Sequence, residues 1–160
     1  ALKAGDPAPD FSLPAVAGEH QFEFRLSDYL GKQCVVITFH PWLDSYLAAQ
    51  VPELNARRQE FSDLNAQVLD ISTDSIPSHI AWQKKDIGMM EIPMCSDFFP
   101  HGSVTAQFGI LRESPPVPGI CERAVFIVNK EGRIAWAKVY PLDQMPNFKE
   151  MLSEVKKLNG

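Results

Sequence analysis

The run from Cys34 to Phe39 constrains the fold of this chain more than any other segment. Its side chains are all apolar or β-branched, which is typical of a central strand that is covered on both faces. A second buried run extends from Gln67 to Ser72, and Leu54 and Phe61 lie between the two runs at helical spacing. Strand, helix and strand in this order predict an α/β layer fold.

The middle of the chain continues this alternation. Asp74 or Ser75 opens a helix with Pro77 in its first turn, where a proline is tolerated, and Gly88 ends that helix. We expect a short strand over residues 92–95 and a short helix from Ser103 that stops at Gly109.

The end of the chain predicts an antiparallel pair of strands and a closing helix. Residues 123–128 form a strand, and the turn at residues 129–132 leads into a partner strand that begins at Ile134. Apolar residues from Phe148 to Leu158 follow the spacing of an amphipathic helix. We therefore predict one thioredoxin-like domain over residues 1–160, with a mixed central sheet flanked by helices, an N-terminal extension and an inserted middle segment.

Composition excludes several classes of function. The formal net charge of −5 disfavours nucleic acid and anionic membranes, because both attract clustered Lys and Arg. The apolar runs all fall short of the ~18 residues of a membrane span. Three cysteines without a Cys-x-x-Cys pair indicate neither a disulfide framework nor a zinc site, and they favour a reducing cytoplasm. We expect no metal and no cofactor.

The segment after the first core strand carries the main indication of function. It reads PWLDSYLA from Pro41 to Ala48, which is Pro-x-x-x-Ser-x-x-Ala. This resembles the Pro-x-x-x-Thr/Ser-x-x-Cys turn of the peroxiredoxins, the alkyl hydroperoxide reductase and thiol-specific antioxidant family. Further stretches resemble the same family in the same order, namely residues 5–11, 68–82, 96–110 and 122–132.

The resemblance implies a thiol peroxidase site on a thioredoxin-like fold with the peroxiredoxin extension and insertion. In that family a cysteine thiolate attacks a peroxide oxygen and becomes a sulfenic acid, which a second thiol reduces. By position, Pro41 shields the pocket, Ser45 supplies the hydroxyl, and Arg123 supplies the cation that stabilises the thiolate. The implied ligand is a peroxide-like molecule or a small anion, with a thiol reductant if the chain is active, and a homodimer is expected by analogy.

The chain departs from the family at the nucleophile. Ala48 occupies the cysteine position, and Val51 stands three residues later, where the family often has Glu or Gln. A one-residue deletion would instead align Leu47 with the cysteine and Gln50 with the Glu or Gln. Neither alignment provides a thiol. The altered neighbours favour natural divergence over an engineered substitution at Ala48.

Other residues near the turn have a structural interpretation beside the functional one. Cys121 precedes Arg123 by two residues, so strand alternation predicts that both side chains lie on one side and that the arginine lowers the thiol pKa. The alternative is a small buried hydrophobe, as for Cys34 and Cys95. Ser45 is equally a helix N-cap. Arg123 has the alternative of pairing with Glu122, Asp44 or another nearby carboxylate.

We expect the ring of His40 to pack against the pocket wall. His101 is expected to form part of a turn and not to act as a ligand.

These residues support three hypotheses. The first is a peroxiredoxin-like protein whose peroxidase chemistry is lost or impaired because Ala48 replaces the nucleophile. The second is an active thiol oxidoreductase that uses Cys121. The third is a non-catalytic interaction or binding module on the same fold.

Overall fold

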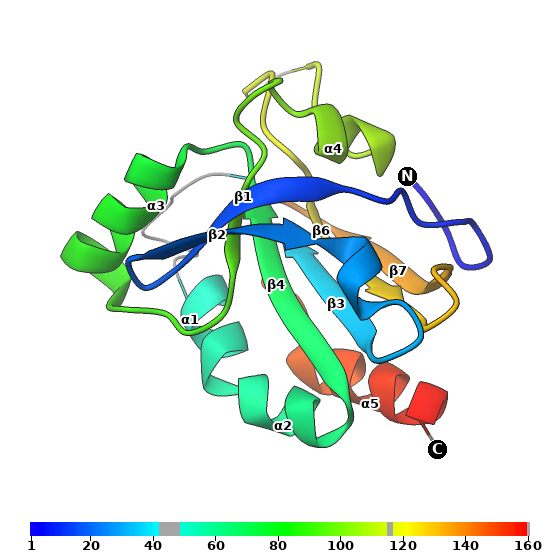
Figure 1. The fold of residues 1–160 in the computed structure, drawn as a ribbon. Coiled ribbons are helices and arrows are strands. Elements are labelled where there is room, and N and C mark those ends of the chain that lie inside the picture. The colour runs from blue at the N-terminus through cyan, green and yellow to red at the C-terminus, as the bar shows by residue number, and fades with distance from the viewer. Residues whose placement is uncertain (42–48, 115–116, 160) are drawn as a thin grey trace.

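The computed structural model describes residues 1–41, 49–114 and 117–159 of the chain. Strands and helices alternate through its middle, and an antiparallel hairpin and a helix end it (Figure 1). The strands are β1 (Ser12–Ala17), β2 (His20–Arg25), β3 (Cys34–Phe39), β4 (Ala66–Ser72), β5 (Met94–Ser96), β6 (Arg123–Val128) and β7 (Ile134–Tyr140). The helices are α1 (Gln50–Ala56), α2 (Arg58–Asp63), α3 (Ile76–Trp82), α4 (Ser103–Gln107) and α5 (Phe148–Asn159), with a 3-10 turn at Leu26–Tyr29.

The strands form one mixed sheet in the order β2-β1-β5-β4-β3-β6-β7. Strands β3, β4 and β5 are parallel neighbours, whereas β6 and β7 run antiparallel on one side and β1 and β2 on the other. The side chains of β3 and β6 are buried throughout. The predicted α/β fold with a mixed sheet is therefore confirmed.

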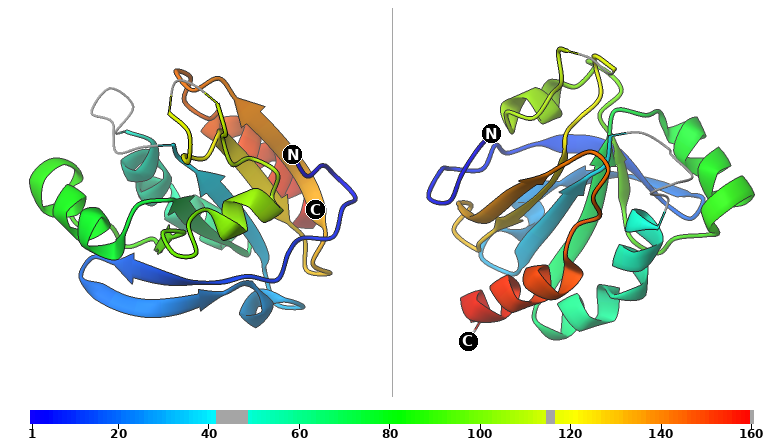
Figure 2. Two further views of the ribbon diagram at one scale, coloured as in Figure 1. Left: turned by 90° about the horizontal axis from the view of Figure 1, so that it is seen from above. Right: turned by 180° about the vertical axis from the view of Figure 1, so that it is seen from behind.

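Each face of the sheet contributes to its own hydrophobic core. On one face, Phe39 and Phe126 pack with Phe108 beside α4. On the other face, Val36 and Val125 pack with apolar side chains of α1, α2, α3 and α5, namely Val51, Leu54, Phe61, Trp82, Met151 and Val155. Figure 2 shows α2 and α5 side by side behind this second face. The two cores hold the ends of the strands in fixed positions.

Local signals explain most of the element ends. Ser75 caps α3 by accepting a hydrogen bond from the Ser78 backbone N–H at 3.2 Å, and Pro77 lies in the first turn as predicted. A π-helical turn, Gln83–Ile87, continues α3 to Gly88, whose φ of +83° ends it. The predicted hairpin is also confirmed, with Gly132 at a φ of +81° in the turn between β6 and β7.

Two boundaries differ from the prediction. The short strand predicted at residues 92–95 is β5, Met94–Ser96. The helical region after the turn divides at Arg57 into α1 and α2, and Pro52 lies in the first turn of α1.

Among the described residues, none of the helices has the length and apolarity needed to cross a bilayer.

Candidate functional site

Polar side chains gather where β3 and β4 end, on the face of the sheet that α1 and α3 cover. Thr38 and His40 come from β3 and the residue after it, and Asp70 and Ser72 come from β4; all four are at most 2% exposed. Thr38 pairs with Asp70 in the register of the two parallel strands. The carboxyl ends of parallel strands are the usual place for a site in an open α/β sheet.

The structure brings Pro41 and Arg123 to this same end of the sheet. Pro41 is buried directly after His40. Arg123 begins β6, and because Phe39 pairs with Ala124, it lies beside the end of β3. Ser45 and Ala48, the other two residues assigned to the turn by resemblance, lie outside the described residues, as do Trp42 and Tyr46.

The guanidinium of Arg123 is 2% exposed and is held by hydrogen bonds. Its Nε donates to the Leu142 carbonyl at 3.1 Å, and its Nη1 donates to Gln50 Oε1. The alternative of a pair between Arg123 and Glu122 is wrong, because Glu122 accepts from Arg112 Nη1 at 2.7 Å. The other named partner, Asp44, lies outside the described residues. Gln50, buried at the start of α1, is the principal contact that sequence reasoning missed.

Gln50 links this cation to a buried carboxylate. Its Nε2 donates to Asp70 Oδ1 at 3.4 Å and to the Phe39 carbonyl at 3.3 Å. Since the Oε1 accepts from Arg123 while the Nε2 faces acceptors, the amide can take only one orientation. Arg123 and Asp70 are thereby joined through a neutral group in a region closed to water.

Asp70 accepts two further hydrogen bonds, one from β3 and one from the residue directly after it. Thr38 Oγ1 donates to Asp70 Oδ1 at 2.7 Å, and His40 Nδ1 bonds to Asp70 Oδ2. The expected packing of the His40 ring is confirmed, since the ring lies 5.4 Å from that of Trp82. Its hydrogen bond to Asp70 was not predicted. An acidic residue inside an otherwise apolar strand was the available sequence signal for it.

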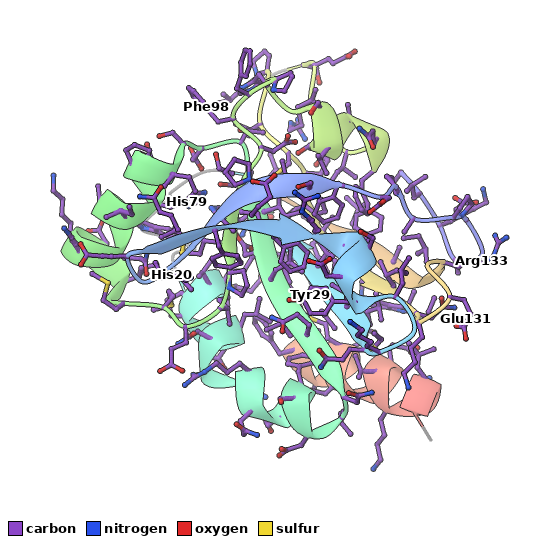
Figure 3. The ribbon with its side chains drawn as sticks, viewed as in Figure 1. His20, Tyr29, His79, Phe98, Glu131 and Arg133 are labelled. Atoms are coloured by element: carbon purple, nitrogen blue, oxygen red, sulfur yellow. The ribbon has the colours of Figure 1, made fainter. Side chains whose placement is uncertain are left out.

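His79 lies on α3 beside this cluster (Figure 3) and is fully buried. Its Nε2 lies 3.2 Å from Ser72 Oγ. Burial, reinforced by the neighbouring His40, lowers the pKa of His79 to about 4. The ring is therefore uncharged at neutral pH.

The prediction that Cys121 shares a face with Arg123 and has a lowered pKa is wrong, and the alternative of a small buried hydrophobe is confirmed. Strand β6 begins only at Arg123, and Cys121 packs in the opposite core with Phe39 and Phe126. Its thiol is fully buried and donates to the His40 carbonyl at 2.8 Å. Burial, together with Asp70 and Asp74, raises its pKa well above the ordinary value, and the opposite effect of Arg123 is smaller.

The other singled-out residues have structural roles. Cys34 and Cys95 are buried in the two cores, as predicted, and burial raises the pKa of Cys95. His101 bonds to the Gly119 carbonyl at 2.6 Å and so joins two loops, in agreement with a turn role. Within the part of the chain that the structure describes, His, Cys, Asp and Glu side chains form no cluster of three or more that could hold a metal ion.

Comparison with known proteins places this arrangement among related chains. The model of the AhpC/TSA family matches residues 4–137. The chloroplastic 2-cysteine peroxiredoxin of Chattonella marina is 34% identical over 157 residues, which cover 94% of this chain and 77% of the relative. The chloroplastic 2-Cys peroxiredoxin BAS1 of Spinacia oleracea is 35% identical over 136 residues, and this chain spans only 49% of its length.

A solved structure supports the same fold. The crystal structure of reduced 2-Cys peroxiredoxin from Plasmodium vivax superimposes with a TM-score of 0.87 over 97% of this chain and 81% of that chain, at 24% identity. The predicted thioredoxin-like fold of the peroxiredoxin type is thus confirmed.

Proposed function

Since this chain belongs to the AhpC/TSA family of peroxiredoxins, we propose that it keeps the pocket of these thiol peroxidases but lacks the cysteine that performs their reaction. The observation that carries the proposal is the sequence from Pro41 to Ala48, which contains no thiol. A methyl group cannot attack a peroxide oxygen. The family reaction therefore requires a cysteine from elsewhere in the chain.

Two alignments of the turn compete, and a contact of Gln50 bears on them. Gln50 bonds to Arg123, whereas Val51 is fully buried in the apolar core. This favours the alignment in which Gln50 takes the family's Glu or Gln position and Leu47 takes the cysteine position. The other alignment assigns the cysteine position to Ala48. Both lack the nucleophile, so the proposal does not depend on the choice.

The remaining thiols support the proposal because they are unsuited to attack a peroxide. Cys34, Cys95 and Cys121 are each at most 1% exposed. The thiolate is the reactive form, and burial in apolar surroundings disfavours it. The raised pKa of Cys121 argues against the alternative in which this residue is a displaced nucleophile.

The proposed ligand is a small peroxide-like molecule or small anion at the Arg123 end of the pocket. A buried guanidinium held in place by Gln50 and the Leu142 carbonyl is a suitable donor for an oxygen atom. A thiol reductant is a partner only if activity remains. Homodimer formation, a cytoplasmic location and a single domain over residues 1–160 stay predictions.

Peroxide consumption under excess dithiothreitol tests the proposal. The unmodified chain should consume hydrogen peroxide no faster than the dithiothreitol blank. Leu47→Cys and Ala48→Cys, made separately, place a thiol in each of the two alignments. We expect the variant with the correct alignment to consume peroxide, because the rest of the pocket is retained.

A Cys121→Ser variant provides the matched control. Rapid consumption by the unmodified chain that this variant abolishes would contradict the proposal and establish Cys121 as the nucleophile. Failure of both restored cysteines would mean that the pocket itself has lost its function, which would favour a non-catalytic module.

A further inference from the structure

Two buried polar atoms at the other end of the site have no hydrogen-bond partner among the described residues. They are His40 Nε2 and Asp74 Oδ2, and they lie 4.0 Å apart. The His40 side chain is 3% exposed, and the Asp74 side chain, although 28% exposed, has this oxygen buried. A buried polar atom without a partner costs free energy. A ligand that supplies the partner would recover that cost.

The hydrogen-bond partner of Nδ1 determines which ring nitrogen of His40 carries the hydrogen. Nδ1 faces Asp70 Oδ2, while Thr38 and Gln50 both donate to the other oxygen, Oδ1. An ionised carboxylate acts only as an acceptor. Nδ1 therefore carries the hydrogen. A second hydrogen, on Nε2, would find no acceptor within hydrogen-bond distance in the described part of the chain. When the ring carries this one hydrogen, Nε2 is a lone-pair acceptor.

The ring of His40 and the backbone of Asp74 are both held by neighbouring groups. The His40 ring packs against Trp82 at 5.4 Å and against His79 at 6.1 Å between ring centroids. The backbone of Asp74 is anchored by Ser96 Oγ, which donates to the Asp74 carbonyl at 2.6 Å. An atom that carries two hydrogens can reach acceptors 4.0 Å apart from about 2.8 Å to each, which is ordinary hydrogen-bond geometry.

The charges around these acceptors favour a cation. Asp70 on β4 and Asp74 after it are acidic. Arg123 on β6 is joined to Asp70 through Gln50, which bonds to both. His79 on α3 is uncharged at neutral pH because burial lowers its pKa to about 4. With one hydrogen on His40, these groups sum to one excess negative charge. An anion at Nε2 would also meet the Asp74 carboxylate.

We propose that His40 Nε2 and Asp74 Oδ2 form a subsite for a primary ammonium group, which donates one hydrogen to each. This goes beyond the proposed function, because it depends on neither the missing cysteine nor a peroxide. The two acceptors lie at the same end of the sheet as Arg123. A small molecule with an ammonium group fits this pair of acceptors, and a simple carboxylate does not.

Nuclear magnetic resonance of the folded chain tests the subsite with three probes. Methylammonium has the charge and the hydrogens, tetramethylammonium has the charge alone, and formate is an anion. The signals of the His40 ring and the Trp82 indole report binding. We expect saturable shifts with methylammonium and none with the other two probes.

Asp74→Asn removes the charge and one acceptor with little risk to folding, because the structure shows no hydrogen bond to the Asp74 side chain from a described residue. We expect the Kd for methylammonium to rise about tenfold, the loss of roughly one charge-assisted hydrogen bond. Asp63→Asn, at an exposed carboxylate on α2, is the matched control and should leave the Kd unchanged.

Several results would overturn the subsite. They are equal shifts with tetramethylammonium or formate, an unchanged Kd in Asp74→Asn, or an absence of shifts with methylammonium. Peroxide consumption measured on the same sample keeps the two proposals separate. Rapid consumption would contradict the missing-nucleophile proposal alone.

Discussion

At the scale of single residues, the site is a set of buried polar groups that stabilise one another. Arg123 and Asp70 are at most 2% exposed, and desolvation of each charge costs several kcal/mol unless hydrogen bonds compensate. Gln50 bonds to both, and Thr38 and His40 complete the shell of donors around Asp70. An arrangement this costly in a small chain indicates function more strongly than stability.

Removal of the Asp70 carboxylate should be strongly destabilising. In Asp70→Ala, the Thr38 hydroxyl, His40 Nδ1 and the Gln50 amide lose their shared acceptor, and Arg123 loses its nearby negative charge. We expect the free energy of unfolding to fall by about 3 kcal/mol, measured by urea denaturation. Asp63→Ala on the exposed end of α2 should change it by less than about 0.5 kcal/mol. Equal effects would contradict the described network.

The buried His79 should make stability depend on pH. Its pKa is about 4 in the folded chain against an ordinary 6.5, so the unfolded chain binds the proton first as the pH falls. The contribution of the uncharged His79 to the free energy of unfolding is complete above about pH 6.5 and is lost progressively toward pH 4. The total loss is about 3 kcal/mol.

Urea denaturation of the native chain and His79→Gln between these pH values measures that contribution. The variant does not titrate at this position, so the free energy of unfolding should fall less steeply with decreasing pH. Parallel pH curves for the two proteins would show that His79 is not the group responsible.

At the scale of elements, local signals made most of the fold predictable. The strand predicted at residues 123–128 is β6, and Ser75, Pro77 and Gly88 mark α3 and its continuation. The polar cluster was not predictable, because it requires the pairing of Thr38 with Asp70 across two strands separated by α1 and α2. The face of the sheet on which Cys121 lies was predicted wrongly, because the alternation of β6 was extended to two residues before the strand begins.

The capping residue of α3 allows a test at this scale. Ser75→Ala removes the side-chain acceptor for the Ser78 N–H, and we expect the free energy of unfolding to fall by about 1 kcal/mol. Ser153→Ala makes the same chemical change at an exposed position inside α5 and should cost nothing measurable in thermal or urea denaturation. A loss at Ser153 as large as that at Ser75 would contradict the assigned cap.

At the scale of the whole molecule, the fold does not depend on the residue that the family uses for chemistry. Among the described residues, two hydrophobic cores on opposite faces of the seven-stranded sheet supply the packing. The proposed loss of the nucleophile is compatible with a chain that still superimposes on a 2-Cys peroxiredoxin with a TM-score of 0.87. The scaffold and the polar cluster at the ends of β3 and β4 can persist for binding alone.

The most direct test of this account is to trap sulfenic acid in the folded chain during exposure to hydrogen peroxide and to locate the label by mass spectrometry. We expect Cys34, Cys95 and Cys121 to remain unlabelled in the native chain, because all three thiols are buried, and to become labelled when the chain is unfolded in urea. Rapid labelling of Cys121 in the native chain, ahead of the other two, would contradict the central claim that this peroxiredoxin fold has no working thiol.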